Sequence, residues 1–151
     1  MSDWPRLPTR RGVSMEMLNV WIAGQPVGKG RPRFARGRVY TPAKTKAYEE
    51  LLAARAIQEM ESAGIETATG PVRIEARAIF TIPKSWPKAK KQAALVGEVQ
   101  HTGKPDADNV LKIVGDALNG IVWDDDSQIV SASIDKRYGV QPALVLTAYI
   151  E

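Results

Sequence analysis

The chain has no cysteine and a single histidine among its 151 residues. The absence of cysteine excludes disulfides, thiolate metal sites and a cysteine nucleophile, and it is compatible with the cytoplasm. No stretch approaches the roughly 18 consecutive apolar residues of a membrane span, and residues 1–20 lack the apolar run of a signal peptide. We therefore expect a cytoplasmic protein without a membrane partner, in which residues 1–14 form a flexible N-terminal tail.

The rest of the composition is that of one globular domain with an excess of positive charge. Hydrophobic residues make up 44% of the chain and charged residues 25%, and a chain of this length can bury one core. The formal net charge is +4 and the sequence pI is about 9.4, which favours a polyanionic partner. We expect residues 15–151 to form this single domain.

Hydrophobic periodicity and turn residues predict alternating strands and helices, without repeats or a linker. Short apolar or alternating stretches bounded by glycine or proline are typical of strands, and apolar residues recurring every three or four positions are typical of helices. The expected strands are residues 17–24, the hairpin 33–40 with its turn at Arg36 and Gly37, and residues 72–82, 128–139 and 143–151. The expected helices are residues 41–64, with Thr41 as N-cap and Pro42 at the first position, and residues 88–97 and 108–120.

This element order indicates the α/β class, as a single domain in which helices cover a mixed β-sheet. The strand at 17–24 is expected to be buried, and the strand at 72–82 to have one solvated face. The last two strands are expected to pair antiparallel. The apolar stripe expected on the helix at 108–120 consists of Val110, Val114, Ala117 and Leu118.

Five aspartates flank the helix expected at 108–120. They are Asp106 and Asp108 at its beginning and Asp124, Asp125 and Asp126 after its end. Because helix N-termini favour carboxylates, Asp108 can be a helix cap and Asp106 a turn residue, with the other three in a solvated loop. Alternatively, the acids share a cation. The two ends of such a helix lie about 20 Å apart, so a shared site requires the loop after the helix to travel back.

The number of carboxylates suits a hard cation. Mg²⁺ is held by one or two carboxylates, with water and substrate phosphates completing its coordination, so three aspartates suit a phosphoryl-transfer site. Lys112 lies one helical turn after Asp108. It could pair with Asp108 or Asp116, or it could reach a substrate phosphate, and the residues alone leave both interpretations open.

A second group of charges is basic and contains no acid. Between residues 26 and 48 it comprises Lys29, Arg31, Arg33, Arg36, Arg38, Lys44 and Lys46. Gly28 and Gly30 would let backbone amides approach a phosphate closely, and arginine side chains match phosphate oxygens. A solvated cationic hairpin is the alternative. The candidate DNA-binding residues are Lys29, Arg31, Arg33, Arg36, Arg38 and Lys104.

Acids that bind a cation and a basic clamp that binds phosphate together predict an enzyme that cleaves phosphodiesters. Two alternatives remain. A non-catalytic basic DNA-binding protein would leave the acids unused, and a metal-dependent nucleotide phosphohydrolase would not need so broad a basic surface. His101 receives no role, because a lone histidine in a loop is more often simply exposed.

Two motifs carry a resemblance to a known family. KPDADNVLKIVGDALNGIVWDDDSQI (residues 104–129) strongly resembles the hallmark of the RusA family of Holliday junction resolvases, and GQPVGKGRPRF (residues 24–34) resembles its basic segment. The resemblance implies a RusA-like fold and a homodimeric endodeoxyribonuclease of DNA recombination and repair. It implies paired symmetric nicks in four-way DNA junctions and dependence on Mg²⁺, with Mn²⁺ as a substitute. It places the catalytic and metal-binding carboxylates on Asp106, Asp108 and Asp126, with Asp125 as a further metal candidate, and the catalytic lysine on Lys112.

The chemistry of junction cutting also favours a homodimer. Resolving a four-way junction needs two nicks related by a two-fold axis, and a symmetric dimer supplies two such sites through one interface. Our candidate dimer contact is the strand face that bears Val145, Thr147 and Tyr149, opposite the face of Leu144, Leu146, Ala148 and Ile150.

Overall fold

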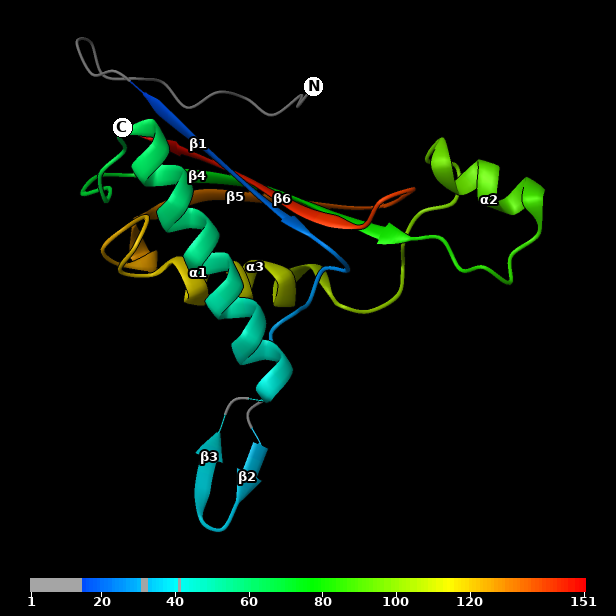
Figure 1. Ribbon diagram of the computed structural model, residues 1–151, viewed down its shortest axis with the longest axis horizontal. Coiled ribbons are helices and arrows are strands. Elements are labelled where there is room, and N and C mark those ends of the chain that lie inside the picture. Colours follow the sequence, from blue (N-terminus) through cyan, green and yellow to red (C-terminus); the bar gives the residue numbers. More distant parts are fainter. Residues whose placement is uncertain (1–14, 31–32, 41) are drawn as a thin grey trace.

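The computed structural model describes residues 15–30, 33–40 and 42–151, so the tail expected at residues 1–14 lies outside the described residues. The strands are β1 (Glu16–Ala23), β2 (Arg33–Ala35), β3 (Arg38–Tyr40), β4 (Val72–Thr81), β5 (Ile129–Gly139) and β6 (Ala143–Ile150). The helices are α1 (Ala43–Ala63), α2 (Lys88–Leu95) and α3 (Ala107–Leu118), with a short 3-10 helix, η1, at Asp126–Gln128. These elements form a single α/β domain with a mixed sheet, which confirms the expected fold class (Figure 1).

The main sheet has four strands in the order β1-β6-β4-β5. β6 pairs antiparallel with β1 and with β4, whereas β5 pairs parallel with β4. The prediction that the last two strands pair with each other is therefore wrong, because β4 lies between them. β5 runs parallel to β4 because it is reached through a long crossover that contains α2 and α3.

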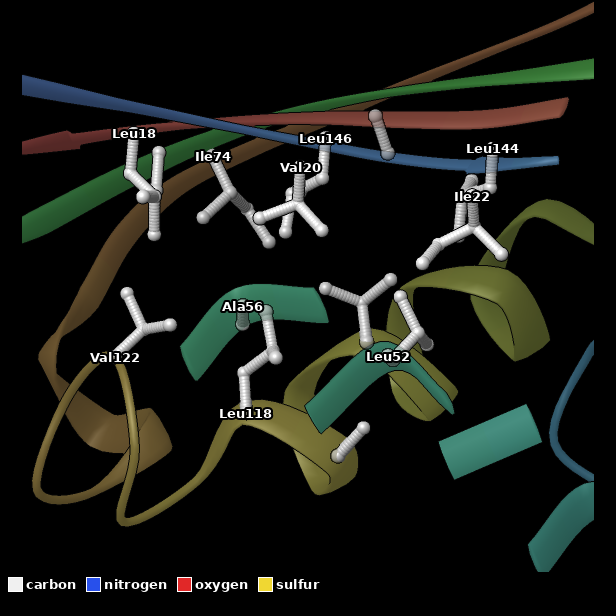
Figure 2. Packing of buried hydrophobic residues seen from close by; sticks show 14 of the residues in the cluster. Leu18, Val20, Ile22, Leu52, Ala56, Ile74, Leu118, Val122, Leu144 and Leu146 are labelled. Carbon is white, nitrogen blue, oxygen red and sulfur yellow. The ribbon is translucent and has the colours of Figure 1, made fainter. Parts of the chain in front are cut away.

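The core lies between the sheet and the two helices α1 and α3, which cover one face of the sheet (Figure 1). Figure 2 shows side chains of the sheet and of both helices pointing into this layer. Those of Leu18, Val20, Ile22, Leu52, Ile74, Leu118, Leu144 and Leu146 are at most 2% exposed. The stripe predicted for α3 is confirmed, since Val110, Val114, Ala117 and Leu118 are all buried. This packing fixes α3, and with it the aspartates at both of its ends.

Two strand surfaces differ from expectation. β1 lies at the sheet edge and is buried on one face only, so Met17 and Trp21 on its other face are 55% and 48% exposed. Arg73, expected on a solvated face of β4, is only 4% exposed. β4 is a central strand, and the Arg73 guanidinium lies 4.2 Å from the centroid of the Tyr149 ring and pairs with Glu75.

The boundaries of α1 agree with the sequence at one end. The helix begins at Ala43, with Pro42 in the cap position and no side-chain capping hydrogen bond, so Pro42 is not the first helical residue. Thr41 lies outside the described residues. Gly64 ends the helix with a left-handed φ of 66°, as expected of a C-cap glycine.

The hairpin turn is confirmed at Arg36 and Gly37, whose φ angles are 50° and 74°. Positive φ at both central residues is the requirement of a type I′ turn, one of the two common two-residue hairpin turns. The hairpin β2–β3 projects away from the domain next to the beginning of α1 (Figure 1). It therefore presents its residues beyond the packed core.

The second face of the sheet is left open by the helices of the described part of the chain (Figure 1). On β6, Val145, Thr147 and Tyr149 are half-buried on this face. Leu144, Leu146, Ala148 and Ile150 are buried on the other face, so the alternation predicted for β6 is confirmed. Within residues 15–30, 33–40 and 42–151, no helix combines the length and apolarity needed to cross a membrane.

Candidate active site

Two exposed aspartates stand at the beginning of α3. Asp106 occupies the N-cap position in an extended conformation, and its side chain makes no capping hydrogen bond. Asp108 lies in the first turn, so the interpretation of Asp108 as the helix cap is wrong. The positive end of the helix dipole favours both carboxylates here. Neither carboxylate is engaged in a hydrogen bond that caps the helix.

The second acidic group lies in the loop between α3 and β5. Asp125 caps η1: its carboxylate accepts a hydrogen bond from the Ser127 amide at 3.2 Å, and its own amide donates to the Gln128 side chain at 2.8 Å. The hydrogen bonds from Ser127 lower the pKa of the Asp125 carboxyl below its usual range. Asp124 and Asp126 are exposed, and Asp124 precedes the cap. Asp125 thus has a structural role, which leaves Asp126 as the more available acid next to it.

Gln128 anchors this loop to the segment that precedes β4. Its side-chain amide donates hydrogen bonds to the carbonyls of Ala68 and Gly70, both at 2.9 Å. Trp123, which precedes the aspartates, is fully buried, and its carbonyl accepts a hydrogen bond from Gly120 at 2.8 Å. The loop therefore closes on itself at the end of α3 and does not travel back along the helix.

The structure consequently keeps the two acidic groups apart within one chain. The 12 residues of α3 lie between them and span about 18 Å at 1.5 Å per residue (Figure 1). In the described ranges, no group of three or more His, Cys, Asp or Glu side chains is placed to hold a metal ion. Asp126 is thus not brought to Asp106 and Asp108 by the fold of a single chain.

The lysine on α3 and the lysine before the hairpin have different surroundings. Lys112 is exposed, and within the described part of the chain it makes no ion pair with Asp108 or Asp116. Asp116 instead pairs with Lys29, at 3.2 Å, and Lys29 also pairs with Glu49 of α1. Lys112 is therefore free to contact a ligand, whereas the charge of Lys29 is balanced inside the fold.

The segment Gly28–Gly30 is a close-packed strap between α1 and α3. A Cβ at Gly28 would lie 2.6 Å from Cβ of Pro105 and 3.2 Å from Cβ of Asn109. The Lys29 amide donates to the Asn109 carbonyl at 2.9 Å, and the Gly30 amide donates to Thr45 Oγ1 at 3.2 Å. The glycines thus allow close packing against the beginning of α3, and these two amides are already engaged within the protein.

A groove runs from this strap to the end of β4, beside the first acidic group. It has a volume of about 860 Å³, and its walls include Gly28–Gly30, Lys44, Lys104 and Asp106. Aromatic rings form its far wall: Phe80 stacks on His101 at 3.7 Å between centroids, and Tyr138 meets His101 edge-on at 5.1 Å. Burial, and then the charge of Lys136, lower the pKa of His101 below its usual value. At neutral pH, His101 therefore contributes an uncharged imidazole ring to this wall.

Sequence reasoning assigned no role to several of these groove residues. His101 lies in a loop without periodicity, and its partners Phe80 and Tyr138 come from the ends of two separate strands. Lys44 carries no signal in the sequence beyond its membership of a basic run. Because β4 and β5 pair in parallel, their ends meet at one edge, and only that pairing brings the rings together.

The remaining basic candidates are placed as follows. Arg36 and Arg38 are exposed on the hairpin β2–β3, and Lys104 is exposed two residues before Asp106. Arg31 lies outside the described residues, and for Arg33 only the backbone is described. Of these candidates, Arg36 and Arg38 thus lie on the hairpin and Lys104 lies beside the groove.

Two comparisons with known proteins bear on this site. The profile of the family described as Endodeoxyribonuclease RusA matches residues 23–148, a range that contains the groove, α3 and both acidic groups. The chain is also similar to a protein of Bacillus subtilis (strain 168), the uncharacterized protein YqaN. The two are 37% identical over 134 residues, which cover 85% of this chain and 92% of that relative.

Proposed function

The chain belongs to the RusA endodeoxyribonuclease family, and from this premise we propose that it is a Mg²⁺-dependent nuclease that resolves four-way DNA junctions by paired symmetric nicks. The observation that carries the proposal is the beginning of α3. There, two exposed carboxylates that do no capping stand next to a groove edged by Lys44 and Lys104. Carboxylates and cations side by side suit a phosphodiester, whose cleavage needs both a cation site and phosphate contacts.

The residues at this place fit a divalent cation. Mg²⁺ is usually held by one or two protein carboxylates, and Asp106 and Asp108 supply that number from positions two residues apart. Both are exposed to the water and phosphate oxygens that complete such a coordination shell. When bound, Mg²⁺ or its substitute Mn²⁺ would offset the phosphate charge and make water a stronger nucleophile.

The other proposed groups act on the DNA itself. Lys112, exposed one turn after Asp108, would donate to a phosphate oxygen and stabilise the charge that develops as water adds to phosphorus. Lys104 and the hairpin residues Arg36 and Arg38 would hold flanking phosphates, together with Arg31 and Arg33. Lys29 is a weaker candidate for a direct contact, because Glu49 and Asp116 already engage its ammonium.

We place the third proposed acid on a second copy of the chain. α3 is about 18 Å long and lies between Asp106 and the loop of Asp126, so a site with all three acids would take Asp126 from another subunit. A two-fold dimer would form two such sites at once, which matches the two symmetric nicks of junction resolution. The open face of the sheet with Val145, Thr147 and Tyr149 remains our candidate contact. The expected solution mass is twice 16.5 kDa.

The direct test is incubation of the purified protein with labelled four-way, duplex and single-stranded DNA, with and without Mg²⁺. We expect paired nicks in the four-way junction only, and only with Mg²⁺. Asp108→Asn should abolish cutting and keep or strengthen junction binding, since it removes negative charge that faces DNA. Junction binding without any cutting by the wild type would favour a non-catalytic DNA-binding protein, and turnover of free nucleotides would favour a phosphohydrolase.

A further inference from the structure

One basic element of the structure has no part in the site described above. The connection from β4 to the beginning of α3 leaves the sheet and carries α2 beyond the sheet end (Figure 1). We call residues 82–100 the α2 arm. Its cations are Lys84, Lys88, Lys90 and Lys91, and its first acid is Glu98.

The α2 arm contributes little to the core. Ala94 is the one buried residue of α2, and the apolar side chains of Leu95 and Val96 at its end are 47% and 71% exposed. An eight-residue helix is too short to be stable by itself in water. Its position is therefore explained neither by burial of an apolar face nor by intrinsic helix stability.

Three of its lysines are available for a partner. In the described part of the chain, Lys84, Lys88 and Lys91 make no ion pair, in contrast to Lys29. Lys90 differs, because its ammonium lies 3.9 Å from the centroid of the Trp86 ring. The arm thus presents a concentration of positive charge that no acid of the described fold balances.

Aromatic rings fix the base of the arm to the groove. The Trp86 ring meets Tyr138 edge-on at 5.2 Å between centroids, and Tyr138 in turn contacts His101, which stacks on Phe80. Tyr138, His101 and Phe80 line the same groove as Asp106. Edge-on and stacked ring pairs of this kind add packing energy and restrict orientation. The base of the arm is therefore held in place relative to the proposed cutting site.

We propose that the α2 arm is a second DNA-binding element, which contacts backbone phosphates on the side of the groove away from the hairpin β2–β3. The inference rests on the proposed nuclease function. Positive charge without a structural partner, in an arm anchored to Tyr138 of the groove that Asp106 also lines, is complementary to the sugar-phosphate backbone that would run through this groove. Lys84, Lys88 and Lys91 supply the contacts, and Trp86 positions them.

The test compares full-length variants that remove charge from the arm or from elsewhere. Lys84→Gln, Lys88→Gln and Lys91→Gln are combined in one arm variant. Arg55→Gln, on α1, is the matched control for Lys88→Gln alone, because each removes one charge. Among the described residues, the side chain of Arg55 makes only a hydrogen bond to Gln58. The affinity for a four-way junction with duplex arms is measured by fluorescence anisotropy over a range of salt concentrations.

We expect the arm variant to bind at least ~10-fold more weakly at low salt, with a salt slope reduced by roughly 2–3 units, or about 0.9 per lost phosphate contact. Lys88→Gln should reduce the slope by about one unit and Arg55→Gln should leave it unchanged. Equal losses in these two variants, or an unchanged slope in the arm variant, would overturn the proposal. If the arm proposal is overturned but the wild type still cuts junctions, the proposed nuclease function stands. If the wild type binds no DNA, the arm proposal and the proposed nuclease function are both wrong.

Variants of Trp86 test the positioning role separately from charge, because they change the ring contact and leave the charge of the arm unaltered. Trp86→Ala removes the ring contact but no charge, and we expect it to weaken junction binding several-fold. Trp86→Phe keeps an aromatic ring against Tyr138 and should restore most of the affinity. Circular dichroism of each variant verifies that the fold is intact. Equal affinity of Trp86→Ala and wild type would contradict the positioning role.

Discussion

The ammonium of Lys29 lies 3.2 Å from a carboxylate oxygen of Asp116 and also pairs with Glu49, so one side chain joins the strap Gly28–Gly30 to both α1 and α3. Burial by itself would lower the pKa of Lys29, but the hydrogen bonds and charges of the two carboxylates outweigh it and raise the pKa above its ordinary value. The two ion pairs of Lys29 thus link α1 to α3.

Lys29→Ala should therefore act first on stability. It leaves the carboxylates of Glu49 and Asp116 without the cation that they share, and we expect a loss of about 1–2 kcal/mol in the free energy of unfolding, measured by urea titration. The stabilisation is present below the unfolded pKa of 10.5 and is lost as pH rises through the higher folded value. Lys112→Ala, at an exposed site on α3, should change stability by less than about 0.5 kcal/mol. Unchanged stability together with a lower salt slope for DNA would instead assign Lys29 to phosphate.

His101 should make stability depend on pH near neutrality. Its folded pKa is below the ordinary 6.5, so stability is full above pH 6.5 and decreases as pH falls through the folded value. His101→Phe keeps a ring against Phe80 without the titration. We expect the urea midpoint of the wild type to fall more between pH 7.5 and 5 than that of the variant. Identical pH profiles would show that His101 does not titrate differently on folding.

Gln128→Ala should destabilise the loop that carries Asp126. The change removes two donated hydrogen bonds and the acceptor for the Asp125 amide, for which about 1–2 kcal/mol is expected. Cutting should decrease as well, because Asp126 is then no longer held. Gln141→Ala is the control, since it removes the same kind of side chain at an exposed position. A Gln128 variant as stable as this control would contradict the anchoring role.

Gly28→Ala tests the strap. The added Cβ would lie 2.6 Å from Cβ of Pro105 and must displace the beginning of α3, at a cost of about 1–3 kcal/mol. Gly103→Ala is matched, because its Cβ would meet the His101 ring at an ordinary 3.8 Å. We expect thermal denaturation to show a lower midpoint for the first variant only. Equal midpoints would mean that the strap yields without strain.

The shared site can be tested by complementation. Chains with Asp108→Asn and chains with Asp126→Asn should each be inactive alone. After mixing and subunit exchange, a heterodimer contains one site with Asp106 and Asp108 from one chain and Asp126 from the other. We therefore expect single nicks in junction DNA from the mixture, measured on denaturing gels. No activity in a mixture that demonstrably exchanges subunits would place the acids of each site on one chain.

Local signals made most of the elements predictable. Gly64 and the pair Arg36–Gly37 need left-handed backbone, and that requirement is visible residue by residue. The position of β5 was not predictable in this way, because its partner β4 lies far away in the sequence and neighbouring strands usually pair. The same limitation hid the groove, whose rings come from β4, β5 and the loop before α3.

The aspartates around α3 are visible in the sequence, but their different structural and functional roles are not. Asp125 and Gln128 have the spacing of a capping box, a signal that could have separated Asp125 from Asp126 in advance. The separation of the two acidic groups by α3 follows from the length of that helix. The path of the loop after α3 depends instead on the burial of Trp123 and on the hydrogen bonds of Gln128, which the sequence does not reveal. The pairing of Lys29 joins three elements, and no periodic pattern encodes such a contact.

The parallel pairing of β4 with β5 makes the connection between them a region of tolerated change. The two strands keep one register from Arg73 opposite Ser131 to Thr81 opposite Gly139, independently of the length of chain that joins them. Closing a flexible connection costs entropy only as the logarithm of its length, so doubling it costs about 0.6 kcal/mol. Insertions or deletions within residues 82–100 can therefore accumulate over evolution with little thermodynamic penalty, and substrate preference can diverge while the scaffold stays the same.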